Sequence, residues 1–216
     1  MDELVDDFWR LRLRRLRHVW KVRRSPSVVT HDLTDPGGDD VLNYLRRRGL
    51  VNAPGDPVKV VYHPDFLSST TPLLGLEYDQ FVRGCHLGVF PSYYEPWGYT
   101  PQECLARAVP AVTSDLSGFG NYLQANIPDH AASGLFMVHR RGKPYEAGVH
   151  ELAGLMWNYT QLGRRQRIDL RNRVEGISGF FHWGLLISHY NRAYDLACSG
   201  TGLGGLLLPP DPPEAT

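Results

Sequence analysis

The chain has 216 residues, of which 42% are hydrophobic, and its 23 basic and 23 acidic residues give a formal net charge of zero. This length is enough for one domain with a sizeable core, but it is too short for two nucleotide-binding domains of ordinary size. Because the charges balance, no overall electrostatic field attracts nucleic acid or an anionic membrane, and we expect neither as a partner.

The cysteines and the N-terminal residues indicate in which cellular compartment the protein is found. Cys85, Cys104 and Cys198 lack the spacing of a metal site, and an odd number of cysteines argues against a disulfide framework. Residues 1–24 mix acidic residues with eight basic ones and contain no uninterrupted apolar stretch, so they predict neither a secretory signal nor a membrane span. We therefore expect a soluble protein of the reducing cytoplasm.

The first predicted elements are short. Apolar residues between Phe8 and Val22 follow helical spacing with arginines on the other faces, which predicts an amphipathic basic helix within residues 1–26. Its basic face is either simply solvated or binds anions, and no nucleic-acid-binding signature accompanies it. Residues 40–48 predict a helix that ends near Gly49, and the β-branched run 58–62 predicts a strand.

The remaining elements follow the order of an α/β fold. The pattern predicts strands over 86–90, 110–114 and 135–139, and helices over 78–84, 101–108, 146–161, 164–176 and 183–198. The first two strands and the helix between them make a βαβ unit with parallel strands. We expect residues 27–198 to form a Rossmann-like parallel sheet with a helical C-terminal part, along which the last helix packs. The Gly- and Pro-rich residues 199–216 predict a flexible tail.

The most informative segment is residues 91–104, which places Glu95 and Glu103 around the start of a predicted helix. Thr100 is expected as the N-cap of this helix, with Pro101 at its first position and Glu103 closing a capping box. A strand, a loop and then a helix start is a common phosphate-binding geometry of α/β folds, because free backbone N–H groups point at the loop. The segment therefore predicts a nucleotide-sugar site.

Several segments carry a family resemblance. Residues 62–74, 81–104, 116–120 and 164–173, together with Trp183, resemble glycogen synthases of the animal and fungal type, and the resemblance runs over residues 27–197. It implies a retaining glycosyltransferase that moves glucose from UDP-glucose to the non-reducing end of an α-1,4-glucan. Such enzymes have two Rossmann-like domains in a glycosyltransferase B-type fold, and this chain resembles most of the second, donor-binding domain. No cofactor is implied, and no Asp-x-Asp pair is placed to hold a metal.

The resemblance assigns roles to individual residues. It implies that Glu95 is catalytic and contacts the transferred glucose, that Glu103 holds the ribose hydroxyls, and that Tyr78 stacks on the uracil ring. The glucose and phosphates would be lined by Trp97, Gly98, Tyr99 and Thr100. The residues by themselves leave plainer readings open: Glu103 as part of a capping box, Glu95 as a surface-loop residue and Tyr78 as a core tyrosine.

Five arginines are clustered on the predicted helix 164–176. Like charges so close together repel unless an anion or an acidic partner is present, although a solvated basic face is the simpler reading. The resemblance implies an allosteric site for glucose 6-phosphate and a homo-oligomer, with Gly176 standing where the family usually has a further arginine. The candidate allosteric residues are Arg164, Arg165, Arg167, Arg171 and Arg173.

Parts of the family's catalytic machinery have no counterpart that we can place in this sequence. These are the glucose-binding histidine of the N-terminal domain and the Arg and Lys that clamp the pyrophosphate. Electrostatic catalysis in an open, wet half-site is weak, so we predict little or no turnover from this chain alone. The alternative function is a non-catalytic nucleotide-sugar or sugar-phosphate binding module.

Overall fold

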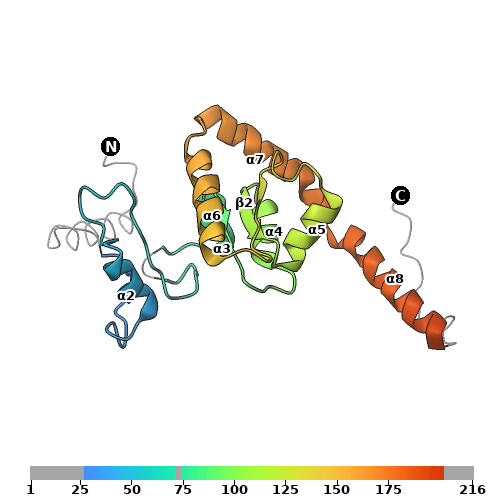
Figure 1. The fold of residues 1–216 in the computed structure, drawn as a ribbon, viewed down its shortest axis with the longest axis horizontal. Helices are drawn as coiled ribbons and strands as arrows, with labels where there is room; N and C mark the ends of the chain where they lie inside the picture. Colours follow the sequence, from blue (N-terminus) through green and yellow to red (C-terminus); the bar gives the residue numbers. More distant parts are fainter. Residues whose placement is uncertain (1–26, 72–73, 202–216) are drawn as a thin grey trace. The chain divides into compact units, whose positions relative to one another are not determined.

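A computed structural model describes residues 27–71 and 74–201 (Figure 1). The chain divides after Leu76 into two compact units. The amphipathic helix predicted within residues 1–26 and the tail from residue 202 lie outside the described residues.

The first unit is built around the short helix α2, Asp40–Arg47. Asp39 caps the helix, because its carboxylate accepts the Leu42 N–H at 2.7 Å, and Gly49 takes a positive φ of 70° just after the helix end. This confirms the helix predicted over 40–48. The strand predicted over 58–62 was wrong: in place of a ladder, an isolated parallel bridge joins Tyr62 to Val29.

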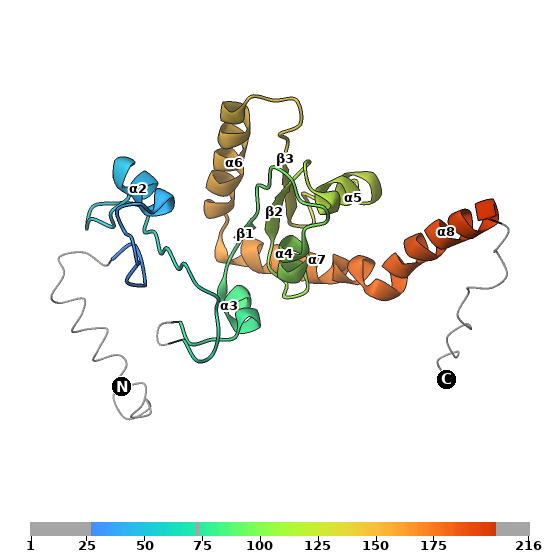
Figure 2. The same cartoon turned by 90° about the horizontal axis from the view of Figure 1, so that it is seen from below.

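The second unit contains a parallel sheet, as the α/β prediction requires. Its strands are β1 (Gly88–Val89), β2 (Ala111–Ser114) and β3 (Leu135–Val138), in the order β1-β2-β3, and Figure 2 shows them side by side. β2 lies at the centre and is buried along its whole length, including the polar residues Thr113 and Ser114. The parallel arrangement confirms the predicted Rossmann-like class of fold.

The helices of this unit lie close to the predicted positions, with one exception. They are α3 (Tyr78–Gly84), α4 (Tyr99–Leu105), α5 (Gly118–Asn126), α6 (Tyr145–Thr160), α7 (Arg164–Ser178) and α8 (Trp183–Thr201). The sequence pattern did not predict α5, because its glycines indicate a turn. Ser117 caps α5 by accepting the Gly120 N–H at 2.9 Å, and apolar residues of the helix are buried against the sheet.

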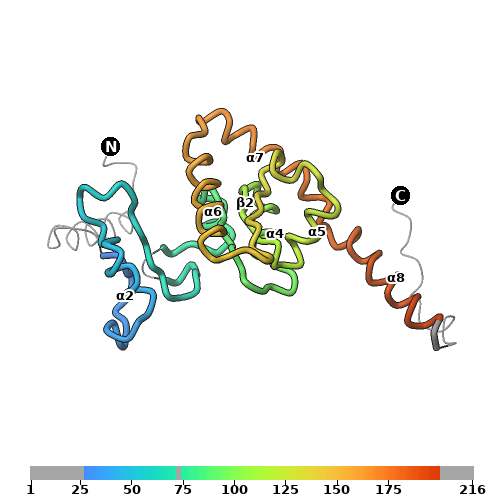
Figure 3. Tube along the Cα trace, viewed as in Figure 1, coloured from blue at the N-terminus to red at the C-terminus, as the bar shows by residue number. Residues whose placement is uncertain are grey.

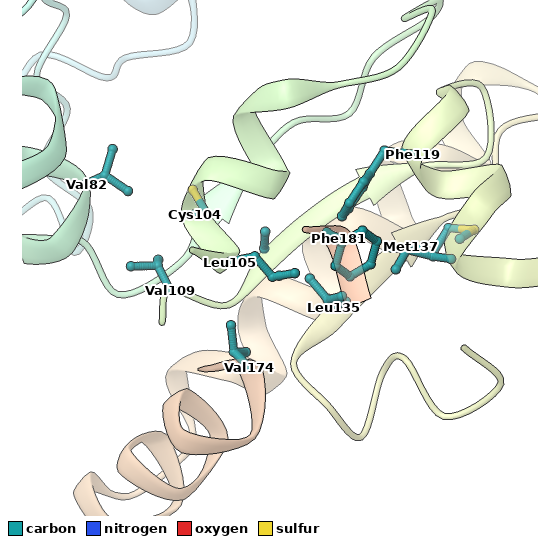
Figure 4. Packing of buried hydrophobic residues seen from close by; sticks show 11 residues of the cluster. Val82, Cys104, Leu105, Val109, Phe119, Leu135, Met137, Val174 and Phe181 are labelled. Atoms are coloured by element: carbon teal, nitrogen blue, oxygen red, sulfur yellow. The ribbon is translucent and has the colours of Figure 1, made fainter. Parts of the chain in front are cut away.

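The core lies between the sheet and the helices α4, α5 and α7 (Figure 4). Phe119 and Leu123 of α5 and Val174 of α7 are completely buried. The core residues labelled in Figure 4 are Val82, Cys104, Leu105, Val109, Phe119, Leu135, Met137, Val174 and Phe181. Because this core fixes the sheet and α4 together, the loop between β1 and α4 has a rigid frame on both sides.

The last helix, α8, differs from the expectation that it packs along the domain. It extends beyond the sheet and the helices around it (Figures 1 and 3), and Trp183, Tyr190 and Tyr194 are each more than half exposed. Its connection to the core is near its beginning, where the ring of His189 lies 6.0 Å from that of Tyr122. The helix continues to Thr201, so residues 199–201 are helical rather than part of a flexible tail.

Candidate functional site

Apart from Tyr78, which begins α3 ahead of β1, the residues predicted to bind a donor lie in the segment that follows β1 of the parallel sheet. β1 leads into the loop 91–97 and then α4, while β2 leads directly into the turn before α5. The carboxyl ends of neighbouring parallel strands meet at one edge, which is the usual ligand-binding edge of open α/β sheets. The geometry therefore brings the loop 91–97 next to the residues that follow β2.

The start of α4 differs from the capping arrangement that the sequence predicts. The N-cap is Gly98 rather than Thr100, no side chain caps the helix, and Thr100 already lies within its first turn. Gly98 takes a positive φ of 107°, a conformation that favours glycine, and this turn lets the helix begin two residues before Pro101. Tyr99 and Thr100 are exposed, so solvent reaches the beginning of the helix.

The loop 91–97 is fixed through its backbone. The Glu95 N–H donates to the carbonyl of Leu116 at 3.4 Å, the Gly118 N–H donates to the carbonyl of Glu95 at 3.0 Å, and the Phe119 N–H donates to the carbonyl of Trp97 at 2.6 Å. The hydroxyl of Ser114 holds the carbonyl of Ser92 at 2.7 Å. The glycines at 118 and 120 indicate a tight turn, but they begin α5 instead, and the close packing of this helix start against the loop is a finding of the tertiary structure.

The carboxylate of Glu95 is not part of this backbone network. Its side chain is half-buried, and no hydrogen bond or ion pair within residues 27–71 and 74–201 involves the carboxylate oxygens. Burying a carboxylate without partners is costly, so a side chain like this one is available for a ligand with positive or hydrogen-donating groups. This supports the prediction that Glu95 faces a ligand.

Trp97 has a structural role that the sequence did not predict. Its ring packs edge-on against Phe119, with centroids 5.9 Å apart, and against Tyr122 at 5.6 Å. Its indole N–H donates to the side chain of Gln102 at 2.7 Å. The indole is thus anchored to α4 and α5, and its predicted contact with the sugar stays a prediction.

Tyr78 and Glu103 come from different helices and meet. Burial, and then a hydrogen bond with the Glu103 carboxylate, raises the pKa of Tyr78 to about 12. Arg107 reinforces this junction between α3 and α4: its guanidinium forms an ion pair with Asp79 and donates to the carbonyl of Glu103 at 3.1 Å. Two residues predicted to bind the two halves of a nucleoside therefore lie side by side, and Glu103 is not committed to a capping box.

The five arginines of α7 do not form one face. At 100° per residue, Arg164, Arg167 and Arg171 share a side of the helix, whereas Arg173 lies opposite. Arg171 donates to the carbonyls of Cys85 and Arg83 at 3.0 and 3.2 Å, which holds the end of α3. Arg173 donates to the carbonyl of Ala132 at 2.8 Å. Two of the five predicted allosteric residues thus also stabilise the fold.

Sequence reasoning missed Asp115 and Arg140, which follow β2 and β3 at the same edge as Glu95. Asp115 is 8% exposed and accepts the N–H groups of Arg140 and Arg141 at 2.7 and 3.2 Å. Their position directly after predicted strands was a usable signal, because polar residues there collect at one edge of a parallel sheet.

Within the described ranges, no group of three or more His, Cys, Asp and Glu side chains is arranged to hold a metal ion. No helix in the same part of the chain has both the length and the apolar character needed to cross a membrane.

Comparisons with known proteins point in one direction. A family model described as glycogen synthase matches residues 1–201, which include the N-terminal residues outside the resemblance over 27–197. The glycogen [starch] synthase of Caenorhabditis elegans is 51% identical over 172 residues, which are 80% of this chain and 25% of that protein. The Neurospora crassa protein of that name is 46% identical over 195 residues, covering 90% and 28%.

The liver glycogen [starch] synthase of Mus musculus is 45% identical over 202 residues, or 93% of this chain and 29% of that protein. The chain therefore spans between a quarter and a third of the length of these relatives, while almost all of it is matched.

Proposed function

Because this chain belongs to the glycogen synthase family, we propose that it forms the donor-binding part of a retaining glycosyltransferase. The donor is UDP-glucose, and the acceptor is the non-reducing end of an α-1,4-glucan. The observation that carries this proposal is the junction of α3 and α4, where Arg107 pairs with Asp79 and donates to the carbonyl of Glu103, because it brings a stacking ring, Tyr78, and a carboxylate, Glu103, to one place.

The nucleoside binds at this junction. The Glu103 carboxylate accepts hydrogen bonds from the two ribose hydroxyls, a task that a donor-only side chain cannot perform. The ring of Tyr78 is 37% exposed and stacks on the uracil, which stabilises binding by about 1 to 3 kcal/mol. Arg107 holds both helices in register through Asp79 and the carbonyl of Glu103.

The glucose and the diphosphate lie toward Glu95 and the start of α4. As UDP leaves the anomeric carbon, positive charge develops on the sugar and negative charge on the diphosphate. The carboxylate of Glu95 stabilises the sugar, while the backbone N–H groups near Gly98, Tyr99 and Thr100 donate to phosphate oxygens. Trp97 keeps this loop in place from the core side.

Calorimetric titration of the purified chain with UDP tests the nucleoside site. We expect Glu103→Gln to weaken UDP binding by about tenfold or more, which corresponds to about 1.4 kcal/mol. Glu146→Gln on the exposed surface of α6 is the matched control and should leave the affinity unchanged. A folded wild-type chain that does not bind UDP would contradict the proposal.

Incorporation of glucose into glycogen tests the transfer step. We expect weak incorporation from this chain alone, and Glu95→Gln should abolish what is observed. UDP binding without any incorporation would instead favour a non-catalytic nucleotide-sugar binding module. The proposed place of action is the cytoplasm, with which the free thiols of Cys85 and Cys104 are compatible.

Regulation by glucose 6-phosphate is proposed for α7, together with assembly into a homo-oligomer. Arg164 and Arg165 are exposed at the beginning of this helix, and no hydrogen bond or ion pair of the described residues engages their side chains. Arg167 is half-buried on the same side as Arg164. The paired substitution Arg164→Ala and Arg165→Ala should weaken glucose 6-phosphate binding by about tenfold without changing UDP binding.

A further inference from the structure

The residue Arg140, which follows β3, reaches across the sheet edge to the loop that carries Glu95. We propose that Arg140 is a positioning residue that fixes the Glu95 carboxylate for the sugar of the donor. This inference rests on the proposed donor site and deepens it, since it assigns the orientation of the reacting end to a residue outside the segment 91–104.

Arg140 holds the beginning of the loop with two different interactions. Its guanidinium donates a hydrogen bond to the carbonyl of Pro91. The same group lies over the ring of Tyr93, with its central carbon 3.5 Å from the ring centroid, which is a cation–π contact. Tyr93 is two residues before Glu95, so this contact fixes the chain immediately ahead of the carboxylate.

Arg140 is itself well supported. Its N–H donates to the buried carboxylate of Asp115 at 2.7 Å, which ties the end of β3 to the end of β2. On the other side lies Gly148 of α6, where an added Cβ would be 3.5 Å from the Arg140 side chain, so the helix packs directly beside the arginine. Because Asp115 and α6 hold Arg140 in place, its side chain fixes the loop relative to the sheet.

The remaining contacts of the loop show why Arg140 is needed. Ser114 at the end of β2 holds the carbonyl of Ser92, and the residues after β2 hold the backbone of Glu95. Arg140 follows β3 instead, and its guanidinium lies over the exposed ring of Tyr93 and holds it. Because its guanidinium is engaged with a carbonyl and a ring, its effect on the donor passes through the loop rather than through direct binding.

The test compares Arg140→Ala with Arg140→Lys in the full chain. UDP-glucose and UDP are titrated separately, because contact with Glu95 contributes to UDP-glucose binding alone. For Arg140→Ala we expect the affinity for UDP-glucose, divided by the affinity for UDP, to fall about tenfold. The affinity for UDP itself should change less than about twofold. Lysine keeps a positive charge and one donor, so Arg140→Lys should restore most of the ratio.

Two further measurements keep the outcome decisive. Adding Glu95→Gln to Arg140→Ala should lower the ratio no further than Glu95→Gln alone, as expected for residues that act as a unit. Hydrogen exchange of the Glu95 amide should accelerate in Arg140→Ala, while exchange within β2 stays unchanged.

The results separate the two proposals. A wild-type chain that does not bind UDP contradicts the donor site, and the exchange data then still decide whether Arg140 orders the loop. Unchanged exchange of Glu95, or an equal loss of UDP and UDP-glucose binding together with faster exchange in β2, would overturn the positioning role.

Discussion

The loop 91–97 and the helix α7 both carry residues proposed to meet a phosphate-bearing ligand, yet they are built in opposite ways. In the loop, neighbouring elements hold the backbone, and the Glu95 carboxylate has no partner among the described residues. In α7 the helix satisfies its own backbone, and the side chains of Arg171 and Arg173 hold carbonyls of other segments.

A charged residue therefore has a different meaning in each setting. A charged side chain on a loop has few structural roles once neighbouring segments hold the loop backbone. An acidic residue there, such as Glu95, therefore indicates a ligand-binding role. A charged side chain on a packed helix can cap a neighbour, as Arg171 does for α3, so a cluster of arginines is a mixture of structural and exposed groups.

The largest expected effect comes from adding one methyl group at Gly118, next to the loop. Gly118→Ala places a Cβ 2.1 Å from the carbonyl oxygen of Pro96, a backbone atom that cannot move without displacing the loop. We expect a loss of about 3 kcal/mol in the free energy of unfolding, measured by urea denaturation.

Gly176→Ala in α7 is the matched control, because nothing lies within 4 Å of its added Cβ. Removing a glycine from a helix interior should raise the free energy of unfolding by about 0.5 to 1 kcal/mol. If both substitutions changed stability equally, the loop would not be held as tightly as the backbone contacts indicate.

The next effect separates the arginines of α7. Arg171→Ala removes two charged hydrogen bonds to the end of α3, so we expect a loss of about 2 kcal/mol by the same denaturation assay. Arg164→Ala is the control at an exposed position near the beginning of the same helix and should change stability by less than about 0.5 kcal/mol. Equal losses would contradict the division of this cluster into structural and exposed residues.

A smaller effect is expected at Trp97. Trp97→Phe keeps an aromatic ring against Phe119 but removes the indole N–H that donates to Gln102, which should cost about 1 kcal/mol. Trp157→Phe on α6 is the control, because this side chain is 66% exposed. A neutral result at Trp97 would show that the hydrogen bond to Gln102 does not fix the start of α4.

The smallest effect is visible at alkaline pH. The pKa of Tyr78 is raised from 10.0 to about 12, so the folded protein keeps this phenol protonated when the unfolded chain does not. The corresponding stability is fully present below pH 10 and is lost as the pH rises toward about 12.

Ultraviolet titration of tyrosinate checks this prediction. Tyr78→Phe should remove the latest ionisation step, and Glu103→Gln should shift that step to lower pH because it removes a neighbouring negative charge. A titration curve that Tyr78→Phe leaves unchanged at its alkaline end would mean that Tyr78 and Glu103 are not in contact in solution.

Much of the fold could be predicted because its signals are local. The buried run of β2 and the long helices α6 and α7 lie within a few residues of their predicted positions. The helix α5 and the start of α4 could not be placed, since Gly118 and Gly98 indicate turns until neighbouring segments are known. The expected strand over 58–62 failed because β-branched residues favour a strand only where a partner strand pairs with them.

Residue types at fixed local spacing are enough to predict the family, the α/β order and the segment that holds Glu95 and Glu103. Folding is what brings Tyr78 to Glu103, Arg171 to the end of α3, and Arg140 to the loop before Glu95. Each of these contacts joins segments far apart in the chain. Such contacts arise from the packing of the sheet edge and its helices, which no local pattern encodes.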